Sequence, residues 1–233
     1  MRSLVGSTVL LTLAMASTAM AGAYGTIDLG FLGRPGPHMG NGGRFDYDIV
    51  DDSGLSLPAD WKLNRYDSPS SKSGGQDGQD DVYSFCIQLT QFVPGNSNAH
   101  TYDVDPIAVG GALDKLGDYY WASAITPGNN TEAGAFQLAA WEIALGNGDL
   151  DISTSPMSSG SFTNAAKTLA QTWLNSLAGL SDILTTRMVS LTNSSYQNQV
   201  TQISAVVPEA ATVVIWSFVA GAIGLVLYRR SAS

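Results

Sequence analysis

Cys86 is the single cysteine of this 233-residue chain, and its thiol is the strongest nucleophile that the sequence offers. A cysteine hydrolase would need a base beside it. Both histidines, His38 and His100, lie in segments typical of loops. A Cys86–His100–Asp103 triad can therefore be written, but local spacing does not support it. The simpler interpretation is a buried cysteine that acts as a small hydrophobic residue.

The second residue of chemical interest is Gln137, in the stretch GAFQLAAWEIALG at 134–146. As a helix this stretch is apolar almost all round, and only Gln137 and Glu142 interrupt it. A buried amide costs free energy unless it is hydrogen-bonded. Gln137 is therefore either bonded to nearby backbone or has a specific task at this position.

The composition restricts the classes of protein to which the chain can belong. It is 44% hydrophobic and 13% charged, which excludes a disordered chain. Its net charge of -9 argues against binding to nucleic acid or to anionic lipid, because both need clusters of Lys and Arg. Residues 22–205 are enough for one medium-sized domain with a core of its own.

Both ends of the chain have the pattern of targeting segments. Residues 1–21 carry Arg2, an apolar run and the small residues Ala19 and Ala21, which is typical of a signal peptide. Residues 210–228 hold no charge and are long enough for one membrane-spanning helix. Arg229 and Arg230 follow at once and favour the cytoplasmic side, so the sequence predicts an exported domain with one C-terminal anchor.

The elements around the two candidate residues follow from hydrophobic periodicity. Residues 22–66 have strand character, 67–81 read as an exposed polar loop, and 82–89 alternate as a strand that carries Cys86. Three helices are expected: from Asp105–Pro106 to a break at 126–130, from Asn130 or Thr131 to Gly146, and from Ser161 or Thr163 to Leu177. Strand character returns over 182–203. This order predicts an α+β fold, a β-sandwich or barrel-like sheet assembly with a helical insertion of about three helices.

Two short motifs in this order resemble the thioester domains of bacterial surface adhesins, also called TQXA domains. The first is Phe85-Cys86-Ile87, and the second is the run from Phe136 through Gln137 to Trp141. The family often has Thr before the glutamine, where this chain has Phe136. The resemblance covers roughly residues 25–203.

The resemblance implies an internal thioester between the side chains of Cys86 and Gln137, formed with loss of ammonia. It implies a single-use covalent attachment to an amine or hydroxyl group on a target, with no enzyme turnover and no cofactor. Trp141 lies four residues after Gln137, on the same helix face, and with Phe136 and Phe85 is expected to shield the bond from water. The alternative is a structural protein of an exopolysaccharide matrix, in which the cross-link only stabilises the fold.

The C-terminal segment, residues 206–233, resembles a PEP-CTERM sorting signal. The matching residues are Pro208 and Glu209 before the apolar run, and Arg229 and Arg230 after it, with Ala210 in place of the second proline. The resemblance implies recognition by a sorting transpeptidase (exosortase), cleavage near Pro208–Glu209, and display on the surface or in the exopolysaccharide matrix of a Gram-negative bacterium.

No metal site is expected from the sequence. Asp46, Asp48, Asp51 and Asp52 are close together, but they lack the spacing and the glycine of known calcium loops. We expect these carboxylates to form a solvated face.

Overall fold

The computed structural model describes residues 24–33, 38–39, 42–66, 81–91, 93, 98–146, 148–154, 162–183 and 185–206. The predicted signal peptide at 1–21 and the segment 207–233, with its apolar run, lie outside the described residues, as does most of the predicted loop at 67–81. Among the described helices, none has both the length and the apolar character that crossing a membrane requires.

The strands form a closed antiparallel sheet. Its strands are β1 (Thr26–Gly33), β4 (Phe45–Asp51), β5 (Trp61–Leu63), β6 (Asp81–Cys86), β7 (Ala99–Pro106), β8 (Thr186–Thr192) and β9 (Gln199–Ala205). The order is β5-β9-β6-β4-β1-β7-β8, and β8 also pairs with β9, which closes the sheet into a barrel. A short hairpin of β2 (His38–Met39) and β3 (Gly42–Gly43) stands beside it.

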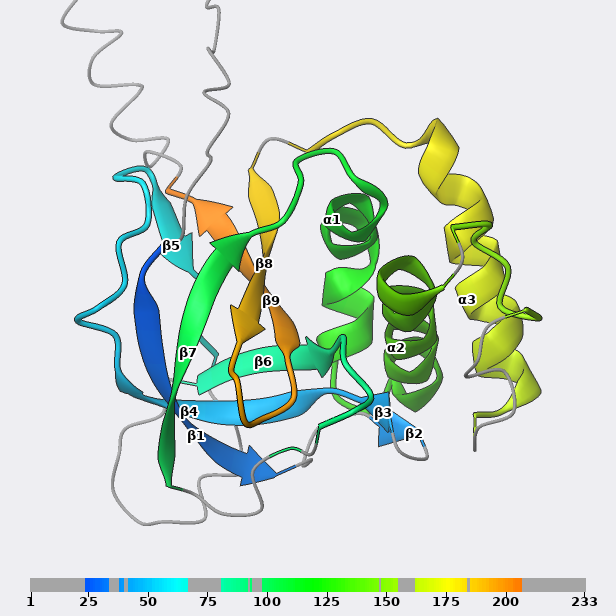
Figure 1. Cartoon of the computed structure of the whole chain (residues 1–233). Coiled ribbons are helices and arrows are strands. Elements are labelled where there is room, and N and C mark those ends of the chain that lie inside the picture. The colour runs from blue at the N-terminus through cyan, green and yellow to red at the C-terminus, as the bar shows by residue number, and fades with distance from the viewer. Residues whose placement is uncertain are drawn as a thin grey trace, which may run out of the picture.

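The helices lie on one side of this barrel, with the first two against the strands and the third packed on the outer side of the second (Figure 1). They are α1 (Ala112–Ile125), α2 (Asn130–Leu145) and α3 (Asn164–Ser176), and a 3₁₀ turn η1 (Leu177–Gly179) follows. Helix α2 lies between α1 and α3 and also contacts β6 and the β2–β3 hairpin. This central position explains a helix that is apolar all round, because every residue from Ala133 to Glu142 is buried.

The predicted α+β class is confirmed, with a barrel and three helices as its parts. Of the two residues predicted to open the third helix, Ser161 and Thr163, the structure selects Thr163, whose side chain accepts a hydrogen bond from the Ala166 N–H. The predicted start of the first helix is wrong. Asp105 and Pro106 end β7, where Pro106 pairs with Val189, and α1 begins only at Ala112 after a turn at Gly110. A proline fits the last position of a strand as well as the first turn of a helix, so the pattern could not separate the two.

Asp46 also departs from the expected solvated face. Its side chain is fully buried and accepts hydrogen bonds from Arg44, itself 2% exposed, at 2.8 and 3.0 Å. The Arg44 guanidinium lies over the Tyr83 ring and donates to the Ile125 carbonyl at the end of α1. This pair therefore ties the barrel to the helical layer instead of facing solvent.

Candidate functional site

The fold brings Cys86 and Gln137 into direct contact, although 51 positions separate them in the chain. The Cys86 N–H donates to Gln137 Oε1 at 3.1 Å, and Gln137 Nε2 donates to the Cys86 carbonyl oxygen at 2.6 Å. Both residues have no exposed surface. The buried amide of α2 is thus satisfied by the backbone of the residue that carries the thiol.

The end of β6 makes this contact possible. The registered pairing of β4 with β6 stops at Phe45–Ser84, so β4 does not cover the backbone of Cys86. On the other edge, the Ile87 N–H donates to the Asn198 carbonyl. Because the backbone groups of successive strand residues point to opposite edges, those of Cys86 face the edge that β4 has left. The Gln137 amide fills that edge as a further strand residue would.

The Cys86 sulfur contacts polar groups from two directions. Its thiol donates to the Gln88 carbonyl oxygen at 2.8 Å, and it accepts a hydrogen bond from the Trp141 indole N–H at 3.4 Å. Trp141 is 3% exposed, and Phe162 packs edge-on against it with ring centroids 5.8 Å apart. Trp141 therefore lies directly on the sulfur, and this pair of aromatic rings covers it.

Phe85 and Phe136 lie on the other side of the strand end. Their ring centroids are 4.5 Å apart, and both pack against Trp121 of α1 at 5.5 and 5.6 Å. All three rings are buried. These rings pack α1 and α2 against β6. Because Gln137 follows Phe136 in α2, this packing positions Gln137.

A group of buried polar side chains around Cys86 was not anticipated from the sequence. Gln199 is the cross-strand partner of Cys86, and its Oε1 accepts a hydrogen bond from Ser84. The Gln197 side chain donates a hydrogen bond to the Gln88 carbonyl oxygen at 2.5 Å. The same oxygen accepts the hydrogen bond from the Cys86 thiol. The available signal was the pattern SYQNQV at 195–200, in which glutamines alternate where a core strand would carry apolar residues.

The structure does not assemble the hydrolase triad. His100 lies in β7 rather than in a loop, and its ring packs on Tyr196 at 4.1 Å. Asp103 is exposed and, three residues further along the strand, points to the opposite face from His100. Of His38 only the backbone, in β2, is described.

Glu142, the other polar residue that interrupts α2, has a different environment from Gln137. It is 1% exposed, and neither carboxylate oxygen has a hydrogen-bond partner in the described structure. The carboxyl group lies against Gly146, where an added Cβ would come within 2.4 Å of Oε1. Gly146 ends α2 as predicted, and a larger residue there would also come within 2.3 Å of the Glu142 backbone carbonyl oxygen.

Replacing this carboxylate is expected to stabilise the protein. In Glu142→Met, a flexible apolar side chain of similar length replaces a buried carboxyl group that has no hydrogen-bond partner among the described residues, so the free energy of unfolding should rise by roughly 1–3 kcal/mol. Urea unfolding monitored by circular dichroism measures the change. Glu132→Met, on the first turn of the same helix, is the matched control. A loss of stability in Glu142→Met would show that the carboxylate contributes to the fold.

An acidic cluster outside this site is explained by its own contacts. Carboxylate oxygens of Asp114, Asp118 and Asp182 lie within 4.8 Å of one another. Arg187 lies among them, 3.7 Å from Asp114 and 3.8 Å from Asp182, and Asp114 accepts backbone N–H groups of Gly110 and Met188. Burial, the largest cause, raises the pKa of Asp114 against these hydrogen bonds, and it raises the pKa of Asp118 against hydrogen bonds from Thr186 and Ile183. The cluster thus anchors β8 to α1, with Arg187 as its cation.

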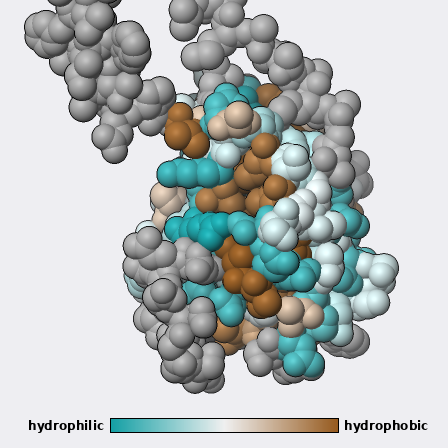
Figure 2. All heavy atoms as spheres, turned by 90° about the vertical axis from the view of Figure 1, so that its left-hand side faces the viewer, coloured by the Kyte–Doolittle hydropathy of each residue, from teal (hydrophilic) through white to brown (hydrophobic). Residues whose placement is uncertain are grey.

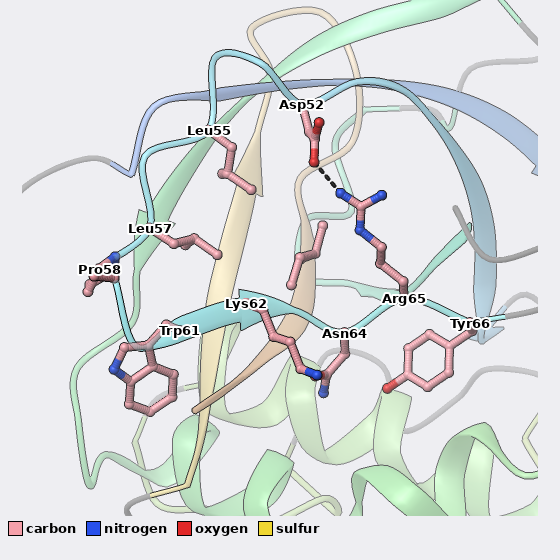
Figure 3. Close-up of a pocket in the computed structure, with 11 residues that line it drawn as sticks. Asp52, Leu55, Leu57, Pro58, Trp61, Lys62, Asn64, Arg65 and Tyr66 are labelled. Atoms are coloured by element: carbon pink, nitrogen blue, oxygen red, sulfur yellow. Dashed lines mark hydrogen bonds and ion pairs between the residues drawn. The ribbon is translucent and has the colours of Figure 1, made fainter. Parts of the chain in front are cut away.

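The described structure also has a cavity that neither Cys86 nor Gln137 lines. It has a volume of about 800 Å³ and is formed by the arch from Asp52 to Tyr66, which an ion pair between Arg65 and Asp52 closes (Figure 3). Figure 2 views the molecule from the side of this arch and shows an apolar strip between hydrophilic residues. Trp61 of the arch pairs with Ala205, whereas Cys86 pairs with Gln199 at the other end of β9. The cavity and the Cys86–Gln137 contact are therefore separate features.

Comparisons with known proteins add little to this geometry. No family model matches the chain, and no curated protein matches it either. One solved structure, the N-terminal thioester domain of a surface protein from Clostridium perfringens in a cysteine-to-alanine variant, is similar over 60% of this chain and 98% of its own. The identity is 13% and the TM-score 0.34, a similarity too low to establish a shared fold or function.

Proposed function

We propose that this protein is a cell-surface protein that stores an internal thioester between Cys86 and Gln137 and uses it once, to attach covalently to a target. The observation that carries the proposal is the buried, reciprocal contact between the Gln137 amide and the backbone of Cys86, the residue that carries the thiol. A nucleophile and an acyl group held in place in this way need little further ordering to react.

The bond would form by attack of Cys86 Sγ on Gln137 Cδ. The C–S bond forms, the C–N bond breaks, and the thiol proton leaves with the amide nitrogen as ammonia. The Cys86 N–H, which already donates to Gln137 Oε1, is placed to stabilise the negative charge that develops on this oxygen. Burial would then protect the stored thioester, because water is its main competitor.

The attachment reverses the roles of the same atoms. An amine or hydroxyl group of the target attacks Gln137 Cδ, the C–S bond breaks, and Cys86 is released as a thiol while an amide or ester remains. The protein is consumed in this reaction, so it is not an enzyme with turnover, and the acyl donor in the chain makes a cofactor unnecessary.

The targeting segments complete the proposal. A signal peptide at 1–21, the span at 210–228 and the sorting residues Pro208, Glu209, Arg229 and Arg230 would place the domain outside the cytoplasm and hold it there. The expected partners are an exosortase, and a target in the exopolysaccharide matrix or on a cell surface. Covalent attachment to a target produces adhesion only when the protein is also anchored to the cell or its matrix.

The alternative is supported by the same hydrogen bonds. The Gln137 amide satisfies the free edge of β6 without any covalent bond, so the pair also fits a structural matrix protein in which helix and sheet are clamped together. In this case Cys86 remains a buried thiol, or a thioester forms that does not react with external nucleophiles.

Labelling with a fluorescent primary amine separates these functions. The adhesin proposal predicts one label per chain, mapped to Gln137 by peptide mass spectrometry, and an equal amount of newly titratable Cys86 thiol. The His100→Ala variant should label equally well, since no hydrolase triad is involved. Label absent from Gln137 after prolonged incubation of freshly purified protein would exclude the covalent function.

A further inference from the structure

Trp141 makes a contact with the site that shielding alone does not require. Its indole nitrogen lies 3.4 Å from Cys86 Sγ, and both residues are buried. An indole N–H can only donate, so the sulfur must be the acceptor in this pair. A tryptophan that merely excluded water could present any edge of its ring, whereas this one presents its single polar atom.

The strength of this hydrogen bond depends on the state of the sulfur. A thiol or thioester sulfur is a weak acceptor, but a sulfur that takes up the electron pair of a breaking C–S bond carries negative charge and accepts strongly. The contact lies in a site without solvent, where such bonds are stronger than in water. An interaction that strengthens as the bond breaks lowers the barrier of that step.

The other polar contact of the sulfur, with the Gln88 carbonyl oxygen, favours a different state of the sulfur. The Gln88 carbonyl oxygen accepts a hydrogen bond from the Cys86 thiol at 2.8 Å, and this bond exists only while the sulfur carries its proton. It therefore favours the thiol before the thioester forms and after the target has been captured. Trp141 is a neighbouring donor that can favour the anionic sulfur between these states.

We propose that Trp141 is a catalytic residue of the thioester, with its indole N–H stabilising the Cys86 sulfur as leaving group. This inference rests on the proposed function. In the step concerned, the amine nitrogen forms its bond to Gln137 Cδ, the C–S electron pair passes to Cys86 Sγ, and the proton lost by the nitrogen returns the sulfur to a thiol. Release of ammonia when the thioester first forms uses the same atoms, with the sulfur as nucleophile.

The variant Trp141→Phe tests this role, because shielding and donation predict effects of opposite sign. Without the N–H donor, opening by methylamine and hydrolysis in buffer should both slow by about tenfold or more, the effect of a lost hydrogen bond to a charged group. A tryptophan that only shields predicts faster hydrolysis, since the smaller ring admits water. Time courses of intact mass on the purified protein give both rates.

Two further variants keep the test decisive. Incorporating benzothienylalanine at position 141 keeps the shape of the indole and replaces only its N–H by sulfur, so it should show the same slowing even where Trp141→Phe fails to fold. Trp173→Phe, a buried indole of α3 that packs on Tyr120, is the control and should leave both rates within twofold of the wild type.

The possible results separate the two proposals. Slower opening of both position-141 variants supports the role of Trp141. Opening that is as fast as in the wild type, or faster, overturns that role and leaves the thioester function intact. A wild-type protein that never forms a thioester overturns the proposed function, and the inference about Trp141 with it.

Discussion

The variant Cys86→Ala is expected to retain the full mass of its sequence, to capture no amine, and to unfold at a markedly lower denaturant concentration than the wild type. The first two results follow because the variant lacks the sulfur that would displace ammonia from Gln137. The third follows because a bond between residues 51 positions apart restricts the unfolded chain. The chain-entropy model gives about 4 kcal/mol for a loop of this length. Intact mass spectrometry and urea unfolding measure these effects.

The matched control for this variant is the wild-type protein after opening by methylamine. It keeps the native sequence except for a methylamide at Gln137, so its loss of stability reports the cross-link without the cavity that Cys86→Ala leaves. Both forms should be destabilised by similar amounts. Equal stability of opened and unopened wild-type protein would show that the cross-link does not stabilise the fold.

Phe85→Ala is expected to have the second largest effect. The ring lies between β6 and the helical layer, 4.5 Å from Phe136 and 5.5 Å from Trp121, and is fully buried. Truncation of such a ring costs about 3–5 kcal/mol, since it loses apolar contacts and leaves a cavity. The change also loosens the packing of α2 against the end of β6, where Phe136 contacts the Phe85 ring. The thioester should therefore form more slowly, as measured by the rate of ammonia loss after refolding.

The variant Phe85→Leu separates packing from chemistry. It refills most of the volume and should recover most of both the stability and the rate of formation. A Phe85→Ala protein that forms the thioester at the wild-type rate would contradict the positioning role and leave Phe85 as ordinary core.

The sequence was sufficient for the parts of the site that depend on local patterns. The alternation at 82–89 and the apolar stretch at 134–146 identified a strand with Cys86 and a helix with Gln137, and the structure contains both as β6 and α2. Gly146 and Thr163 marked helix ends because their effects on the backbone are local.

The remaining features depend on contacts between distant segments, which no local pattern contains. Asp46 is buried together with Arg44, whose guanidinium donates to the Ile125 carbonyl 81 positions along the chain. His100 lies in a strand because β7 pairs with β1 at this residue. The free edge of β6 at Cys86 results from the point at which β4 diverges. The hydrogen bond from Trp141 to the sulfur depends on the orientation of one ring, whereas the sequence predicted only its helix face.

The central claim is that Cys86 and Gln137 form a thioester that a nucleophile can open. The most direct test is the intact mass of the freshly purified protein, beside its Cys86→Ala variant, before and after addition of methylamine. We predict a wild-type mass lower than that of the sequence by one ammonia, a gain of one methylamine on treatment, and neither change in the variant. A wild-type protein of full mass with a freely titrating Cys86 thiol would contradict it, and the Gln137–Cys86 contact would then be a hydrogen-bonded clamp.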